Sequence, residues 1–176
     1  MRRALLLASL LLAACTGDPV TGHLGGFGDP VRGAALWAPR NLGDTARWAG
    51  DPAGAAMAAA QLEFLARSFR ENPVWAPGTS LGTLTALAAG QRELRAALGI
   101  RPDAPAAPVE FQLRAASRAL RAGSTPGAQA ALSGPDFTLA PAETLRRLGN
   151  LPHLPAVAWA AGAVGEEIGR RSWPPR

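Results

Sequence analysis

Apolar residues in this chain recur at helical spacing, and this periodicity restricts the possible folds more than any other feature. From Ala58 they fall at Leu62, Leu65 and Phe69, which places them on one stripe of an α-helix. No segment shows sustained alternation of apolar and polar residues with β-branched side chains, and there is no Asn-Gly hairpin turn. The pattern therefore predicts an all-α fold.

Signals for helix starts and ends divide this pattern into five or six helices joined by Pro/Gly-rich connections. Asp51 and Pro52 form a strong start signal, because Asp caps free N–H groups and Pro fits the first turn. That helix should end at Asn72, before Pro73. Further helices are expected over about 79–98, 106–122, 124–134, 141–149 and 155–171. We predict a single small bundle over residues 29–173, with close contacts between Ala- and Gly-rich stripes.

The N-terminus has the pattern of an export signal. Arg2 and Arg3 precede an apolar run from Ala4 to Leu12, and small residues follow. The run is far shorter than the ~20 residues that cross a bilayer as a helix. We therefore expect an export signal at this end rather than a permanent membrane helix.

The end of this run resembles the lipobox of bacterial lipoproteins. Leu12, Ala13, Ala14 and Cys15 match its pattern of an aliphatic residue, two small residues and Cys, and Cys15 is the only cysteine of the chain. The resemblance implies that residues 1–14 are a lipoprotein signal peptide removed before Cys15. It also implies that acyl chains on Cys15 bind membrane lipid. An ordinary secretory cleavage after Cys15 is the alternative interpretation.

The residues after the lipobox suggest a location and a tether. In the lipoprotein family an Asp directly after the Cys commonly signals retention in the inner membrane, and this chain has Thr16 there. The resemblance thus implies a lipid-anchored protein of the cell envelope, at the outer membrane and facing the periplasm. Residues 15–28 combine the lipidated Cys15 with a Gly-rich stretch, which we expect to be a flexible tether reaching ~20 Å.

Charge and compartment exclude nucleic acid as a partner. Loss of Arg2 and Arg3 with the signal peptide lowers the formal net charge from +5 to +3, which is a weak positive field. Export also places the domain away from nucleic acid.

Tryptophan and arginine side chains are the best candidates for a binding surface. The tripeptide Trp-Ala-Pro occurs twice, at Trp37-Ala38-Pro39 and at Trp75-Ala76-Pro77. Trp and Arg often dominate recognition surfaces. The residues predicted to bind are Trp37, Arg40, Arg47, Trp48 and Trp75. The expected partner is an envelope protein or a cell-wall component. Alternatively, each Trp covers an end of the bundle and anchors a proline turn.

Nothing in the sequence points to a catalytic centre. No nucleophile elbow, zinc protease motif, calcium loop or dinucleotide fingerprint is present, and His153 is the only His of the predicted bundle. We therefore predict a non-catalytic binding or structural module without a cofactor or metal. Two alternatives remain: a helical pocket for a small apolar or lipid ligand, and an enzyme that uses His153 with a carboxylate in a cleft.

Two groups of charged residues are expected to be ordinary features of helix surfaces. Arg114, Arg118 and Arg121 should form a solvated outer face, or a face attracted to anionic head groups or cell-wall polymers. Glu166 and Glu167 should each pair with the Arg four residues later, rather than work together as an acid and a base.

Overall fold

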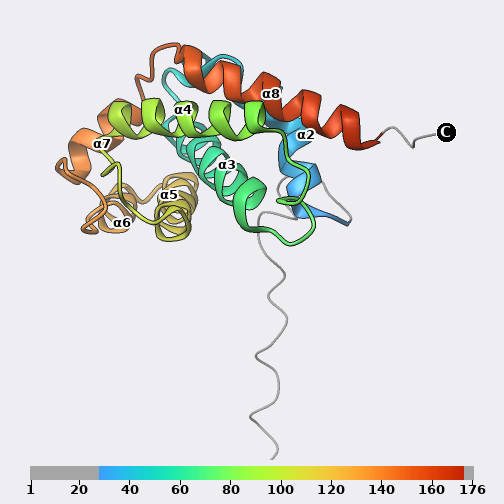
Figure 1. The fold of residues 1–176 in the computed structure, drawn as a ribbon. Helices are drawn as coiled ribbons and strands as arrows, with labels where there is room; N and C mark the ends of the chain where they lie inside the picture. Colours follow the sequence, from blue (N-terminus) through green and yellow to red (C-terminus); the bar gives the residue numbers. More distant parts are fainter. Residues whose placement is uncertain (1–27, 173–176) are drawn as a thin grey trace, which may run out of the picture.

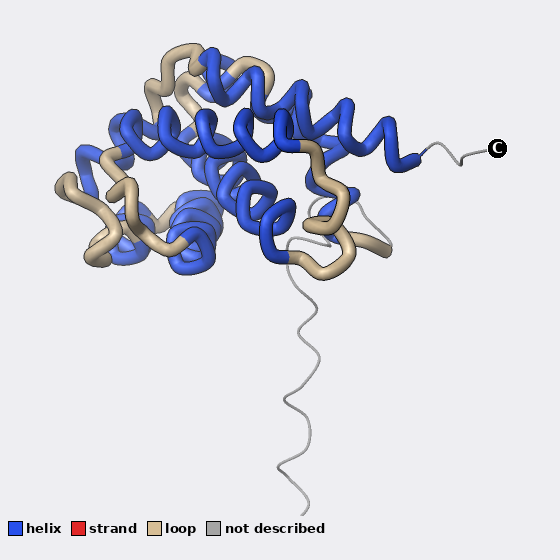
Figure 2. The backbone as a smooth tube through the Cα atoms, viewed as in Figure 1, coloured by secondary structure: helices blue, strands red, loops and turns tan. Residues whose placement is uncertain are grey.

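The computed structural model describes residues 28–172, and this part of the chain is all-helical (Figures 1 and 2). The elements are α2 (Pro30–Leu42), the 3₁₀ turn η1 (Thr45–Trp48), α3 (Pro52–Glu71), α4 (Leu81–Leu98), α5 (Ala106–Arg121), α6 (Thr125–Ala131), α7 (Pro141–Leu148) and α8 (Pro155–Ser172). Strand-like pairing within 28–172 is confined to one isolated bridge between Ile100 and Phe137. The all-α prediction is confirmed. The predicted signal peptide and Cys15 lie outside the described residues.

The helix starts follow the capping residues in the sequence. The Asp51 side chain accepts a hydrogen bond from the backbone N–H of Gly54, and Ser80 accepts one from Thr83 at the start of α4. At the other end of α4, Gly99 adopts the left-handed conformation, with φ of 70°. Glycine enters this region without a steric penalty, so it ends the helix cleanly.

One helix was not anticipated from the sequence. α2 covers the segment that contains Trp37, Ala38 and Pro39, so the described part has seven α-helices where we expected five or six. Its start signal is the same as that of α3, because Asp29 caps the helix and Pro30 follows. Pro39 lies inside this helix, where it removes the one hydrogen bond that a backbone N–H would donate to the Ala35 carbonyl.

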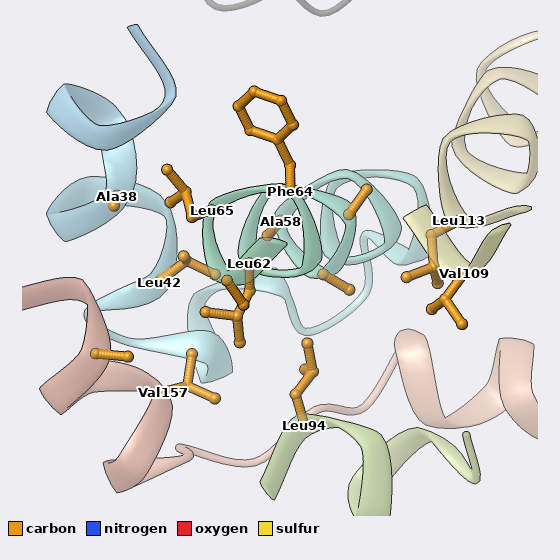
Figure 3. Packing of buried hydrophobic residues seen from close by; sticks show 14 of the residues in the cluster. Ala38, Leu42, Ala58, Leu62, Phe64, Leu65, Leu94, Val109, Leu113 and Val157 are labelled. Carbon is orange, nitrogen blue, oxygen red and sulfur yellow. The ribbon is translucent and has the colours of Figure 1, made fainter. Parts of the chain in front are cut away.

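α3 is the central helix of the bundle. It packs against α2 on one side and α5 on the other and is crossed by α4, while α8 packs against α4 and α2 (Figures 1 and 3). Leu62 and Leu65 on α3 are fully buried, and they lie between Leu42 of α2 and Leu113 of α5 (Figure 3). The core is therefore built around one helix that is buried along almost its whole length.

Gly90 and Gly165 let neighbouring helices approach closely. The expected close contact along the small residues of α8 is wrong for Gly162 and Gly169, where a Cβ atom would have no neighbour within 4 Å. A Cβ atom at Gly90 of α4 would lie 3.0 Å from the Ala156 carbonyl oxygen and from the Ala160 Cβ of α8. A Cβ atom at Gly165 would lie 3.3 Å from Cγ of Pro39. Atoms of the neighbouring helix therefore occupy the space that a side chain would take at these two glycines. Within residues 28–172, none of the helices has both the length and the apolar character needed to cross a membrane.

Candidate functional site: a tryptophan–arginine patch

Four of the five predicted binding residues lie together where α2 ends and η1 follows. The Arg40 guanidinium carbon is 5.5 Å from the ring centre of Trp37, and that of Arg47 is 5.1 Å from the ring centre of Trp48. The Arg47 guanidinium also donates a hydrogen bond to the backbone carbonyl of Arg40, which joins the two pairs. We call Trp37, Arg40, Arg47 and Trp48 the Trp/Arg patch.

Hydrogen bonds from the core fix the geometry of this patch. The indole N–H of Trp48 donates to the backbone carbonyl of Asn41 at 2.8 Å. The Asn41 side-chain amide donates to Oε1 of Gln61 at 2.8 Å, and the buried Nε2 of Gln61 donates to the backbone carbonyl of Ala34 at 2.7 Å. Since α3 thereby holds the last turns of α2, the patch has a rigid support.

Close packing at the start of α3 also positions Trp48. A Cβ atom at Gly54 would lie 2.5 Å from two ring carbons of Trp48, so only glycine leaves room for this indole. Trp48 is consequently half-buried, whereas Trp37 keeps 42% of its surface exposed. The neighbouring Leu36 is 58% exposed. The outer part of the patch is thus an aromatic and aliphatic surface beside two exposed guanidinium groups.

The chemistry of this surface suits recognition rather than bond making. Arg guanidinium groups bind carboxylates through paired hydrogen bonds, and their planar faces stack on aromatic rings. Trp and Arg are also the residues most enriched among those that dominate protein–protein affinity. The patch can therefore hold an acidic or aromatic partner surface.

Trp75 lies apart from the Trp/Arg patch. Its side chain is only 6% exposed, and its ring packs edge-on against Phe69 with 5.7 Å between the ring centres. Its indole N–H donates to Asp29, the N-cap of α2, so Trp75 lies by the opposite end of that helix. Arg171 lies over the outer ring face at 5.1 Å. These contacts match the alternative interpretation, in which a Trp anchors a proline turn.

His153 has a carboxylate partner, but the pair is exposed. Its Nδ1 atom lies 3.2 Å from the Asp44 carboxylate, and the two side chains are 54% and 61% exposed. Close by, the Thr45 hydroxyl donates to the Pro152 carbonyl at 2.5 Å and accepts from the Leu154 N–H at 3.0 Å. His153 thus belongs to a contact between η1 and the connection before α8. Water reaches both groups, so they lack the desolvated setting that strengthens acid–base catalysis.

One of the two expected glutamate pairs on α8 is present. Arg171 contacts Glu167 at 3.0 Å as predicted, but Arg170 also binds Glu167, at 2.5 Å, rather than Glu166. Burial disfavours the charged form of Glu167, yet hydrogen bonds from both arginines, the Ser80 N–H and the Thr83 hydroxyl outweigh it. Together they lower its pKa to about 2. Glu167 therefore stays ionised and holds α8 against the start of α4.

The predicted solvated arginine face of α5 is wrong for Arg114. Its side chain is 10% exposed, contacts Glu110 at 2.5 Å and lies 5.7 Å from the ring centre of Phe64 on α3. Arg67 of α3 reaches the same carboxylate at 2.9 Å. Arg118 is exposed, as expected. The Glu110 charge explains the burial, because it gives Arg114 a partner inside the α3–α5 contact.

Two exposed residues with no part in the sequence analysis stand out where the α3–α4 connection leads into α4. Val74 is 72% exposed and Leu81 is 79% exposed. In the sequence they resemble ordinary core residues. The absence of charged residues around them is the one sequence feature that could have suggested an exposed apolar surface.

No group of three or more His, Cys, Asp or Glu residues that could hold a metal ion occurs within 28–172. Comparisons with protein families, with curated proteins and with solved structures gave no match to this chain.

Proposed function

We propose that this chain is a lipoprotein anchored through acyl chains on Cys15, whose helical domain is a non-catalytic binding module of the cell envelope. The lipobox pattern of Leu12 to Cys15 supports the anchor, and Thr16 supports an outer-membrane location facing the periplasm. These residues lie outside the described part of the chain, so the support is that of the sequence.

The Trp/Arg patch carries the binding part of this proposal. Trp37 and Leu36 are large apolar side chains on an exposed helix face, and two guanidinium groups accompany them. A surface held rigid before binding loses little conformational entropy when a partner docks. The partner that this chemistry favours is an envelope protein that presents carboxylate and aromatic side chains. A cell-wall polymer with carboxylates is the second candidate.

The apolar-pocket alternative has less support. It relied on small residues that leave space beside Leu, Phe and Trp. Gly90 and Gly165 instead lie at contact distance from the facing helix. These glycines act in packing, which favours a surface site over an internal one.

Crosslinking in the native host tests the binding site. A photoreactive amino acid at Leu36, beside Trp37, should give a crosslinked species, and the Trp37→Ala substitution should abolish it. The same photoreactive group at Phe111 is the matched control, because Phe111 is 66% exposed but lies on α5. If the partner is instead a cell-wall polymer, the protein should sediment together with purified cell wall. Equal crosslinking at both positions, or no crosslinking and no sedimentation, would overturn the assignment.

A further inference from the structure

The α3–α4 connection exposes two apolar side chains within an uncharged stretch. Val74 and Leu81 are the most exposed large hydrophobic residues of the described chain. From Asn72 to Gln91 the sequence contains no charged residue. Two arginines of α8 contact this stretch, because Arg170 donates to the Ser80 hydroxyl at 3.3 Å and Arg171 donates to the Trp75 carbonyl at 2.9 Å. Exposed apolar side chains beside arginines are suited to the boundary between acyl chains and polar head groups.

The backbone of the connection enforces this exposure. The Asn72 side-chain oxygen accepts the N–H groups of Val74 at 2.9 Å and Trp75 at 3.1 Å, and the Thr79 hydroxyl donates to the Trp75 carbonyl at 2.6 Å. The Trp75 ring is buried, whereas the adjacent Val74 is 72% exposed. Leu81 directly follows the Ser80 cap, at the first position of α4. Both apolar groups are therefore presented on a fixed support.

The connection lies beside the point where the chain enters the domain. The hydrogen bond from Trp75 to Asp29 joins it to the N-cap of α2, and Asp29 is the second described residue. In Figure 1 the start of α2 and the α3–α4 connection lie at the same end of the molecule, and α6 and α7 lie at the other. A lipid group on Cys15 would be attached to this end of the domain.

We infer that Val74 and Leu81 insert into the boundary between lipid head groups and acyl chains when the chain is anchored through Cys15. This inference rests on the proposed lipidation. The sequence predicts that residues 15–28 form a tether reaching ~20 Å, and such a tether would limit the separation from the anchor. The anchor thereby raises the effective concentration of this surface at the membrane. Burial of the two aliphatic side chains then favours contact.

The contact is apolar rather than electrostatic. Charged side chains at the connection have both signs, because Arg170 and Arg171 donate to it and the Asp29 carboxylate accepts from Trp75. Neutral phospholipid should therefore suffice. The orientation also has a consequence for the Trp/Arg patch, because α2 leads away from the membrane-facing end over a length of ~20 Å. The patch would then be presented to partners away from the bilayer surface.

A vesicle-partitioning experiment tests this surface. The mature chain, residues 15–176, is coupled at its single thiol to a maleimide that carries one acyl chain, and its partition onto phosphatidylcholine vesicles is measured by sedimentation. One acyl chain gives only marginal, reversible membrane binding, so an additional contact between the protein and the bilayer changes the measured partition. The double variant Val74→Ser and Leu81→Ser should partition about tenfold more weakly than wild type. The matched control Phe111→Ser, which removes an equally exposed hydrophobic group on α5, should leave the partition unchanged.

Amide hydrogen exchange on the same vesicles gives a second measurement. Exchange over residues 73–81 should be slower in the vesicle-bound wild type than in the free chain, and exchange over residues 111–121 should not change. Equal partitioning of all three proteins, or unchanged exchange over 73–81, would overturn the inference. Because the acyl chain is attached chemically, this result does not depend on lipidation in cells. Absence of lipidation in the native host would instead overturn the proposed anchor.

Discussion

Asp29 joins α2 to the α3–α4 connection through a single carboxylate. One oxygen accepts the backbone N–H of Val31 at 2.9 Å and so caps the helix, while the other accepts the indole N–H of Trp75. One residue thus fixes the start of the domain against the loop that we infer to contact lipid. The orientation of that loop depends on this pair.

The pair gives a first prediction for stability. Trp75→Phe keeps most of the buried ring but leaves one Asp29 oxygen without its donor, so the free energy of unfolding should fall by about 1–3 kcal/mol. Urea denaturation followed by circular dichroism measures the change. The control Trp37→Phe alters an exposed ring and should change the free energy of unfolding by less than about 0.5 kcal/mol.

A second prediction concerns the buried ion pair between α3 and α4. Arg95 donates to both carboxylate oxygens of Glu63, at 2.8 and 2.7 Å, and the Glu63 side chain has no exposed surface. Arg95 also donates to the carbonyls of Pro102 and Ala104, both at 2.9 Å. Replacing Glu63 by Gln leaves a buried guanidinium without its counter-charge, which should cost about 3–5 kcal/mol.

An exposed ion pair provides the control for this experiment. Glu143 and Arg146 are in contact at 2.7 Å on the surface of α7. Water and salt screen such a pair, so Glu143→Gln should leave the denaturation midpoint almost unchanged at neutral pH. Equal destabilisation by the two substitutions would contradict the assigned role of the Glu63–Arg95 pair.

A third prediction concerns acid stability. The pKa of Glu167 is lowered in the folded chain from 4.5 to about 2. A lowered folded-state pKa contributes stability above the unfolded-state pKa, and this contribution is lost as pH falls from about 5 to about 2. Glu167→Gln should therefore lower the free energy of unfolding by about 3 kcal/mol at pH 7 and by much less near pH 2.

Denaturation curves over this pH range measure the effect. Glu166→Gln is the control, because Glu166 is exposed on the same helix and the two arginines bind Glu167. A destabilisation by Glu167→Gln that is the same at pH 7 and at pH 2 would show that the charge of this residue is not involved.

A fourth prediction tests the close contact between α4 and α8. Gly90→Leu would place a large side chain where even a Cβ atom lies 3.0 Å from two atoms of α8, so it should destabilise the chain by about 1–3 kcal/mol or more. Gly162→Ala is the contrasting variant, because a Cβ atom there has no neighbour within 4 Å. The higher helix propensity of Ala should stabilise the chain by about 0.5–1 kcal/mol. Thermal denaturation compares the two.

The helices were predictable from local signals, and their long-range contacts were not. Asp51 with Pro52 identified the start of α3 correctly. The same pair of residue types at Asp29 and Pro30 begins α2, but Pro39 made that segment resemble a turn. Pro39 costs α2 one backbone hydrogen bond, and burial of the apolar stripe of α2 outweighs that cost.

The candidate site was partly predictable for the same reason. Trp37, Arg40, Arg47 and Trp48 are close in sequence, and they are close in space. Trp75 was grouped with them because the tripeptide Trp-Ala-Pro occurs at both places. Its hydrogen-bond partner Asp29 lies 46 positions away in the sequence, a separation that no periodicity reveals. The exposure of Val74 beside the buried Trp75 is likewise a feature of the folded connection that no periodicity reveals.

The state of Cys15 in the native host tests the account most directly. Intact mass and cell fractionation are compared for wild type and Cys15→Ala. Wild type should lack residues 1–14, carry added acyl mass and appear with membranes, while Cys15→Ala should carry no acyl mass and stay out of the membrane fraction. A wild-type protein that is unacylated, soluble and cleaved at another position would contradict the lipid anchor.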